Sequence, residues 1–318
     1  MINANDEDLH PVGDGGHWQE SYYFNWADPA HDAFGLTRIG YRFGQDRIDG
    51  LVLTIHDGRP EFVYPAVNLK GGAPWTDHTA AGGLRAKELV YRMEEPLERW
   101  KIELRGRHEI DLTWTAFTPA FDYHASGARV AENVAAWHFE QSGTVTGHLR
   151  LKGNELEING TGQRDKSWGV RDWANVEGWN WISAQFGEGL SFNVWEGFLG
   201  GERYVNGFVH REGTNRAVVR LELKYRWPKR MHVPESAFLN IVDEKGDRYQ
   251  VTASSLGHCP LIKSGLWIEE VFAGFTLNDG HTEHEGIGVI EHAWHAGSRR
   301  TLLGMRQLLR AAGDLYRR

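Results

Sequence analysis

Residues 160–173 hold the densest mixture of charged and aromatic side chains in the sequence. Asp165 follows Arg164 directly, and two tryptophans, Trp168 and Trp173, come shortly after. Carboxylates with shifted pKa values beside aromatic walls are typical of acid–base sites, so this segment is the first candidate for a ligand-facing site. An ion-pair network between two domains, covered by the tryptophans, would need the same residue types. Charges of both signs among glycines are typical of neither a solvated strand nor a core strand. A turn could bring Lys166 close to Asp165, but we favour an extended segment, in which the two side chains point to opposite sides.

The chemistry that these residues suit is the protonation of carbon. A hydratase or cyclase of an unactivated alkene needs a carboxylic acid kept neutral by burial, and aromatic faces that tolerate a carbocation. We predict that Asp165 is this acid and that Arg164 belongs to the same catalytic group. Each tryptophan alone would suit the filling of a barrel equally well. The aromatic walls would come from Trp168, Trp173, Trp179, Trp181 and Trp195.

A second group of acidic and histidine side chains lies between His281 and His295. Its order is not the His-Glu-x-x-His of a helical zinc site, so we expect no metal and no cofactor. In a strand over residues 286–292, Glu291 would face one side and His292 the other. One of the two should therefore face inward, and Glu291 is a candidate binding residue.

A third group occupies residues 20–26. Strand alternation places Glu20 and Tyr22 on one face and Tyr23 and Asn25 on the other. Either pair could line a pocket, with Tyr22 as a proton relay and with Glu20 and Tyr23 as binding residues. An edge strand with a Tyr–Glu hydrogen bond is an equally good interpretation.

The elements that must position these groups are strands joined by short turns. Apolar residues alternate on both sides of Asp57-Gly58, which predicts a hairpin of residues 51–56 and 61–67. A hairpin is also predicted around Ser142-Gly143, joining residues 134–141 to 145–151. Strands connected in this way pair antiparallel. The same pattern predicts further hairpins around Gly106, Gly200-Gly201 and residues 244–247.

Composition favours a mostly β protein and excludes several functions. The 318 residues include 38 Gly, 14 Trp, 10 Tyr and 14 Phe, which suit turns and pleated sheets. A net charge of −8 gives no electrostatic attraction to nucleic acid. The single cysteine, Cys259, cannot form an internal disulfide, and we find neither a signal peptide pattern nor a transmembrane segment. We therefore expect a cytoplasmic protein without a nucleic-acid partner.

The chain divides into two expected domains and one expected helix. The N-terminal barrel domain would span residues 1–155 and the C-terminal barrel domain residues 156–297. Residues 298–318 carry leucines at helical spacing after a candidate N-cap, Ser298, which predicts a short amphipathic helix.

Several motifs resemble those of one protein family. They are His138-Phe139-Glu140-Gln141, the segment 158–172 with Arg164-Asp165-Lys166-Ser167-Trp168, and the upstream pieces 18–25, 38–42 (Arg-Ile-Gly-Tyr-Arg) and 96–100. This signature resembles that of the proteins related to bacterial carotenoid 1,2-hydratase, together with kievitone hydratase and the lipocalin-like Diels–Alderases, across residues 18–292. The upstream pieces are similar to those of an uncharacterised bacterial branch.

The resemblance implies two lipocalin-like antiparallel β-barrel domains, with a hydrophobic tunnel or cleft at or near their junction. It also implies that the strand with His292 comes near the Arg164-Asp165 motif, which makes His292 a candidate second proton carrier. Lys166 stands where the family usually has His, so the role of that histidine does not transfer. Asp165 remains the candidate acid.

The leading hypothesis is a cofactor-independent hydratase, cyclase or isomerase. It would act by proton transfer on a hydrophobic isoprenoid, polyketide or aromatic molecule in a β-barrel pocket. The alternative is a carrier that binds a hydrophobic ligand without changing it. Carbohydrate processing by two carboxylates is a third hypothesis, and the weakest. The sequence leaves open the substrate, the direction of reaction and the oligomeric state, a homo-oligomer included.

Overall fold

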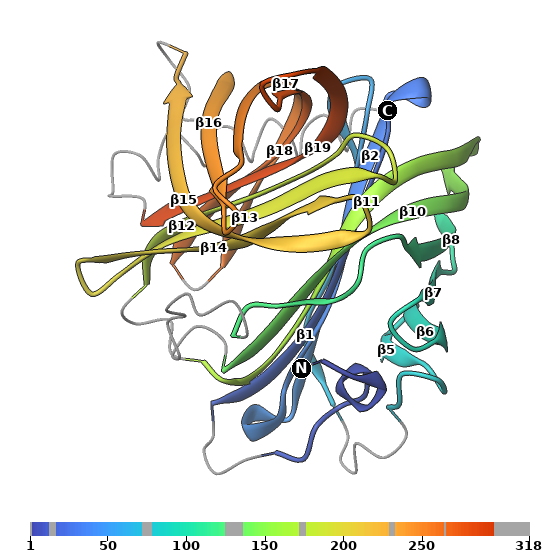
Figure 1. The fold of residues 1–318 in the computed structure, drawn as a ribbon. Helices are drawn as coiled ribbons and strands as arrows, with labels where there is room; N and C mark the ends of the chain where they lie inside the picture. The colour runs from blue at the N-terminus through green and yellow to red at the C-terminus, as the bar shows by residue number, and fades with distance from the viewer. Residues whose placement is uncertain are drawn as a thin grey trace. The chain divides into compact units, whose positions relative to one another are not determined.

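The computed structural model describes residues 2–12, 17–71, 78–124, 136–171, 176–228, 233–263 and 265–295 (Figure 1). The helix expected at 298–318 and the side chain of Trp173 lie outside these residues. Within the described ranges, none of the helices is long and apolar enough to cross a membrane.

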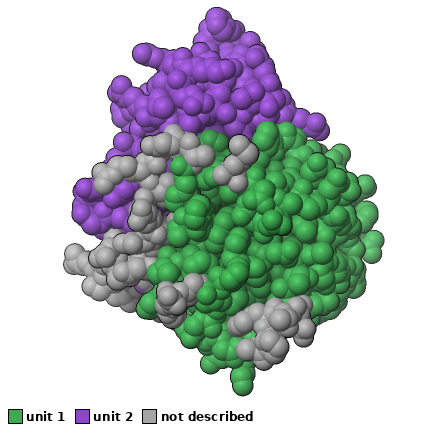
Figure 2. Space-filling view, turned by 60° about the horizontal axis from the view of Figure 1, so that its bottom comes forward, with its two compact units in different colours: residues 1–54, 62–125, 131–172 green, residues 55–61, 126–130, 173–318 purple. Residues whose placement is uncertain are grey.

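The chain forms two compact units (Figure 2). The first contains residues 1–54, 62–125 and 131–172, and the second contains residues 55–61, 126–130 and 173–318. The boundary expected near residue 155 falls inside strand β11 (Asn154–Val170), whose partners along its length are strands of the first unit. Each unit is built on one antiparallel sheet, as expected for two lipocalin-like barrels.

The first sheet has the strand order β4-β3-β2-β1-β11-β10-β8-β7-β6-β5, and β9 pairs with β10. Three short 3₁₀ helices, η1 (Ala4–Glu7), η2 (Pro29–His31) and η3 (Phe43–Gln45), accompany it. Its other strands are β1 (Trp18–Asp28), β2 (Ala33–Arg42), β3 (Arg47–His56), β4 (Arg59–Lys70), β5 (Leu84–Ala86), β6 (Leu89–Glu95), β7 (Arg99–Leu104), β8 (Glu109–Ala116), β9 (Phe121–Asp122) and β10 (Trp137–Leu151).

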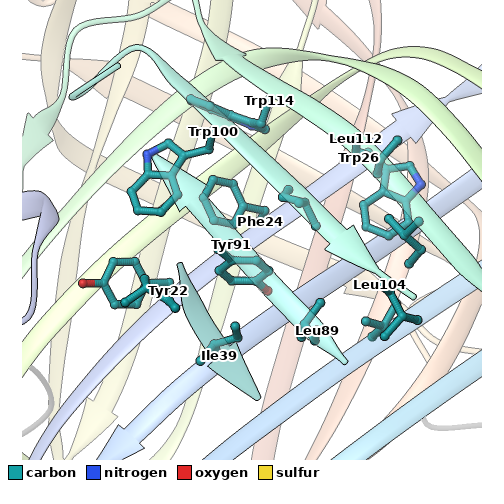
Figure 3. Close-up of a cluster of buried hydrophobic side chains, with 14 of the residues drawn as sticks. Tyr22, Phe24, Trp26, Ile39, Leu89, Tyr91, Trp100, Leu104, Leu112 and Trp114 are labelled. Carbon is teal, nitrogen blue, oxygen red and sulfur yellow. The ribbon is translucent and has the colours of Figure 1, made fainter. Parts of the chain in front are cut away.

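The two ends of this path approach one another, so the sheet forms a nearly closed barrel. A Cβ placed on Gly50 of β3 would lie 2.6 Å from the Cβ of Ala86 on β5 and 3.3 Å from that of Ala66 on β4. The interior is filled by aliphatic and aromatic side chains, and Phe24 contacts the rings of Tyr91, Trp100 and Trp114 (Figure 3).

The second sheet is a closed barrel with the strands in sequence order. A cluster of buried aliphatic and aromatic residues, which includes Phe192, Leu239 and Phe275, fills the interior. The strands are β12 (Val176–Gln185), β13 (Leu190–Leu199), β14 (Glu202–Arg211), β15 (Thr214–Arg226), β16 (Ser236–Asp243), β17 (Arg248–Lys263), β18 (Leu266–Asn278) and β19 (Glu283–His295).

Four of the five predicted hairpins are confirmed, and the one around Ser142-Gly143 is wrong. The β3–β4 turn at Asp57-Gly58 and the β7–β8, β13–β14 and β16–β17 connections lie where the turn residues predict them. In contrast, β10 runs straight through Ser142 and Gly143. Gly143 marks a close approach there, because a Cβ would lie 2.5 Å from Trp114 Cζ2 and 2.6 Å from the Thr115 carbonyl oxygen.

The composition of residues 160–173 is atypical of a strand, yet β11 continues to Val170, as the extended geometry requires. Its charged side chains alternate between the two faces of the sheet, and those on the core face are paired with acidic residues elsewhere in the unit. A charged segment can therefore form a buried strand when its partners come from distant parts of the chain.

We predict that Gly143→Ala destabilises the protein by about 1–3 kcal/mol, because the added methyl group would overlap the Trp114 ring and the β8 backbone. Urea denaturation measures this change. The matched control is Gly274→Ala in β18, where an added Cβ would meet no atom within 4 Å. Equal stability of the two variants would contradict the role given to Gly143.

Candidate functional site

Strand β11 presents its candidate residues on two opposite faces. Lys166 pairs with Tyr22 of β1, whereas Asp165 pairs with Tyr23. Tyr22 belongs to the core of the first barrel, so Arg164 and Lys166 face the core and Asp165 faces away from it. The alternation predicted for Asp165 and Lys166, and for Tyr22 and Tyr23, is confirmed.

On the core face, Arg164 forms a bidentate ion pair with Glu7 of η1. Its Nη2 lies 2.7 Å from Glu7 Oε1, its Nη1 donates to Glu7 Oε2 at 3.0 Å, and both side chains are almost fully buried. Its Nε donates to Gln141 Oε1 at 2.9 Å. Burial favours a raised pKa for Glu7, but the Arg164 charge and its hydrogen bonds outweigh this and lower the pKa.

Lys166 also bonds the N-terminal segment, residues 6–10, to the sheet. Its Nζ lies 3.2 Å from Glu20 Oε2 and donates to the backbone oxygens of residues 6 and 8. The Tyr22 hydroxyl donates to the carbonyl oxygen of Glu7 at 2.9 Å. His10 stacks on Trp168, with ring centroids 4.2 Å apart. Four residues predicted for the active site (Arg164, Tyr22, Glu20 and Trp168) therefore contact or adjoin the N-terminal segment.

The opposite face of β11 carries a second polar group, formed by His138, Glu140 and Asp165. Glu140 of β10 pairs directly with Asp165, and His138 lies one pleat away on the same side. His138 Nε2 is 2.9 Å from Glu140 Oε1. Gln163 Nε2 donates to Glu140 Oε2 at 2.8 Å, so the Glu140 carboxylate is held from both sides. We call these three residues the Asp165 cluster.

Asp165 itself is unpaired. The carboxyl group makes no hydrogen bond and no ion pair within the described part of the chain, and the residue is half-buried. Burial raises the pKa of Asp165 to about 6, and the Glu140 charge adds to this rise, while His138, Arg171 and Arg38 oppose it. This carboxyl is therefore a group that can exchange a proton near neutral pH.

His138 is held as a neutral ring beside Asp165. Burial lowers the pKa of His138 to about 4. The imidazole stacks on Tyr123, with centroids 4.4 Å apart and planes 8° from parallel, which fixes the ring orientation. Neutral histidine can both donate and accept a proton, so this ring suits a relay.

The ligand atoms of His138, Glu140 and Asp165 all lie within 4.8 Å of one another, so the cluster could hold a divalent cation. The positive charges of Arg38 and Arg171 act on Asp165 and disfavour a further cation beside it. No metal was predicted here from the sequence.

His292 lies in the second unit, on the interior side of its barrel. Its Nδ1 is 2.6 Å from Asn180 Oδ1, which also accepts a hydrogen bond from the Tyr225 hydroxyl at 2.9 Å. Asn180 Nδ2 donates to Glu196 Oε2 at 2.7 Å. The amide is thus oriented with its oxygen toward His292, which makes Nδ1 the protonated ring nitrogen. Burial lowers the pKa of His292 to about 4.

Glu291 faces the opposite way from His292, as alternation predicts. It pairs with Trp181 of β12 and with Glu270 of β18, and it accepts a hydrogen bond from Trp179 Nε1. Trp195 pairs with Trp181 on the neighbouring strand. These candidate binding residues share one face of the second barrel, and His292 lies on the other.

The sequence identified Asp165 and Tyr23 in two separate groups, and the structure brings them together and adds His138, Glu140, Arg38 and Arg171 around them. The four added residues carried a detectable signal, because all of them occur in motifs that resemble the hydratase-related family. Their shared face follows from strand register, which the sequence does not fix.

Comparison with known proteins supports the fold. The sequence profile described as "Domain of unknown function (DUF7064)" matches residues 3–296. No curated protein sequence matches the chain. Among solved structures, a putative AttH from Nitrosomonas europaea matches with a TM-score of 0.61 and 14% identity, covering 91% of this chain and 100% of that one.

Two further structures are similar at the same level. Kievitone hydratase from Nectria haematococca has a TM-score of 0.65 and 15% identity, covering 92% of this chain and 93% of that one. CghA has a TM-score of 0.68 and 14% identity, with 88% and 89% covered, and it has also been solved with Sch210972. These likenesses establish the shared double-barrel fold.

We predict that Glu7→Gln destabilises the protein by about 3–5 kcal/mol, because it leaves the Arg164 guanidinium buried without a counter-charge. Urea denaturation at neutral pH measures the loss. Glu94→Gln removes one side of an exposed ion pair with Arg99 and should cost less than about 1 kcal/mol. A Glu7 variant as stable as the Glu94 variant would refute the importance of the buried pair.

We also predict a pH-dependent contribution of Asp165 to stability. The pKa of Asp165 in the folded protein is about 6, above its ordinary 3.8, so the folded state holds this proton more tightly than the unfolded chain. Its contribution is full below about pH 4 and is lost as the pH rises through about 6. Asp165→Asn cannot ionise, so it should exceed the wild type in stability by about 3 kcal/mol at pH 8 and by less than about 1 kcal/mol at pH 4.

Urea denaturation of both proteins across this pH range tests whether the stability difference between them grows as the pH rises. Asp57→Asn, at an exposed turn position, is the control and should track the wild type throughout. A constant difference between Asp165→Asn and the wild type would mean that Asp165 titrates at its ordinary pKa.

Proposed function

The chain belongs to the family described as a domain of unknown function, DUF7064, and we propose from the Asp165 cluster that it is an enzyme of the hydratase, cyclase or isomerase type. It moves a proton between Asp165 and a hydrophobic small molecule without a cofactor. His138 and Glu140 relay the proton. The proposal is supported most by one observation, which is that Asp165 is partly accessible, unpaired and raised in pKa to about 6.

The pKa of Asp165 suits a group that must both give and take a proton. At pH 7 about one molecule in ten carries the proton on Asp165, and the rest carry the carboxylate. Both forms are therefore populated near neutral pH. A carboxyl with an ordinary pKa would be protonated about a hundredfold less often at this pH.

The residues around Asp165 allow its proton to be replaced. Glu140 lies directly across from it, and His138 contacts Glu140 at 2.9 Å. Because Gln163 holds Glu140 and Tyr123 holds His138, both groups keep a fixed position through a catalytic cycle. Proton exchange with solvent can then pass along this pair.

The nature of the substrate is supported by the surroundings of the cluster and by the similar proteins. Tyr23 and Tyr123 place aromatic rings beside the polar groups. Kievitone hydratase is a hydratase by name, and CghA has been solved with Sch210972. An isoprenoid, polyketide or aromatic molecule remains the proposed class.

This proposal gives no part in the proton transfer to His292, Arg164 and Tyr22. Arg164 and Tyr22 hold the N-terminal segment in the first barrel, and His292 belongs to a separate hydrogen-bonded group with Asn180 and Tyr225. We therefore assign the proton transfer to the Asp165 cluster alone.

Asp165→Asn should lower turnover of an identified substrate by about 10²–10⁴-fold, because it removes the positioned proton donor. A panel of hydrophobic alkenes and enones, incubated in D₂O, reports turnover as deuterium bound to carbon by mass spectrometry. If Asp165 acts as the acid, the rate should fall as the pH rises through about 6. EDTA should leave the rate unchanged, since the step uses a proton and no cation.

Asp57→Asn is the matched control and should keep full activity, because its side chain is exposed in the β3–β4 turn. Turnover by Asp165→Asn within a few-fold of wild type contradicts the assignment. Recovery of unchanged ligand at stoichiometric occupancy would instead favour the carrier.

A further inference from the structure

Arg38 of β2 lies in line with Asp165 on the same face of the first sheet. Tyr23 of β1 pairs with Asp165 on one side and with Arg38 on the other. The three residues therefore form a row across β11, β1 and β2. Two strand spacings separate Arg38 from Asp165, a distance of about 10 Å between their Cα atoms.

The Arg38 guanidinium has no partner among the residues that the structure describes. It forms no hydrogen bond and no ion pair with any residue in the described ranges, although it is half-buried. Asp49 and Asp165 act on its charge only from beyond ion-pair distance. In contrast, Arg42 on the same strand has partners: its Nε lies 2.9 Å from Asp49 Oδ2 and its Nη1 donates to Gln45 at 2.7 Å.

An unpaired, partly desolvated cation lowers stability, so its presence calls for a partner that arrives from outside. The five N–H donors of a guanidinium form a planar fork that matches the two oxygens of a carboxylate. Asp49 is already used by Arg42, and Asp165 lies a full strand beyond Tyr23. The group that would pair with Arg38 is therefore one with two anionic oxygens.

Gly40 leaves room for the guanidinium of Arg38. A Cβ at Gly40 would lie 2.5 Å from both terminal nitrogens of Arg38, so the guanidinium lies over the place that a side chain would take. The backbone of Gly40 does not have a positive φ, so the backbone itself does not demand glycine. Gly40 is needed for the space it leaves to Arg38.

We propose that Arg38 binds the carboxylate of a hydrophobic acid and holds that substrate across Tyr23 from Asp165. This inference rests on the proposed function and names its substrate class. The carboxylate pairs with the Arg38 fork, the apolar body lies along Tyr23, and the reacting carbon reaches Asp165. The span between the two groups sets the distance from carboxylate to reacting carbon at several bonds.

Calorimetric titration with two probes tests the proposal. Naphthoate carries the carboxylate on an aromatic body, and naphthalenemethanol is its neutral counterpart. Wild-type protein should bind naphthoate at least tenfold more tightly than the alcohol. Arg38→Gln should reduce that ratio to below about twofold, because the remaining amide offers no charge and no fork.

Two further variants separate the effect of the position of the Arg38 guanidinium from the effect of its charge. Gly40→Ala keeps the Arg38 charge but displaces its fork, so it should also lose most of the naphthoate preference. Arg85→Gln removes an exposed arginine from β5 of the same barrel and should keep the wild-type ratio. Because Arg38 has no partner to lose, Arg38→Gln should melt at or above the temperature of the wild type.

Absence of a naphthoate preference in the wild type, failure to bind either probe included, would overturn the proposal. A marked loss of thermal stability in Arg38→Gln would also overturn it, because that result makes Arg38 structural. These outcomes are independent of the proton transfer. The naphthoate preference is measured by binding to the wild type and to Arg38→Gln, whereas the proposed function is tested by the turnover of Asp165→Asn.

Discussion

The buried ion pair between Arg164 and Glu7 is the interaction on which the arrangement of the first barrel depends. Arg164 lies among the rings of Trp100, Trp114 and Phe139, with its Cζ 5.1–5.8 Å from their centroids. A guanidinium in such a place is tolerated only with a counter-charge and with aromatic faces around it. Glu7 supplies the counter-charge, so the N-terminal segment becomes part of the barrel core.

This pairing determines what the other face of β11 can do. Since Arg164 and Lys166 use their charges on Glu7 and Glu20, neither is available to neutralise Asp165. Asp165 then meets only distant arginines, and burial dominates its pKa. Strand alternation, which separates neighbours in sequence by the thickness of the sheet, thus creates a proton-exchanging carboxyl next to two cations.

Much of the architecture could be predicted from the sequence because its signals are local. The Asp57-Gly58 turn and the alternation of Glu20, Tyr22 and Tyr23 depend only on neighbouring residues. The path of β11 could not be predicted, because Glu7 and Arg164 are 157 residues apart and only the folded sheet brings them together. Gly143 was misread for a related reason, since the Trp114 ring that requires it comes from another strand.

The residues around Asp165 show the same limit. Asp165 was identified by its type and surroundings, whereas His138, Glu140 and Arg38 are added by register across four strands. The family resemblance contained these positions without their roles, and a motif alone does not show which side chains share a face. Strand register brings residues from separate motifs onto one face of the sheet, where they form one site.

Carbon-13 NMR titration of the Asp165 side-chain carboxyl tests the central claim most directly. Selective labelling, with Asp165→Asn to identify the signal, isolates this carboxyl among the other carboxylates. The account predicts a midpoint near pH 6, set by burial and by the separation of Asp165 from Arg164 and Lys166. A midpoint near pH 4 would contradict it, because Asp165 would then be an ordinary carboxylate that stays ionised at neutral pH.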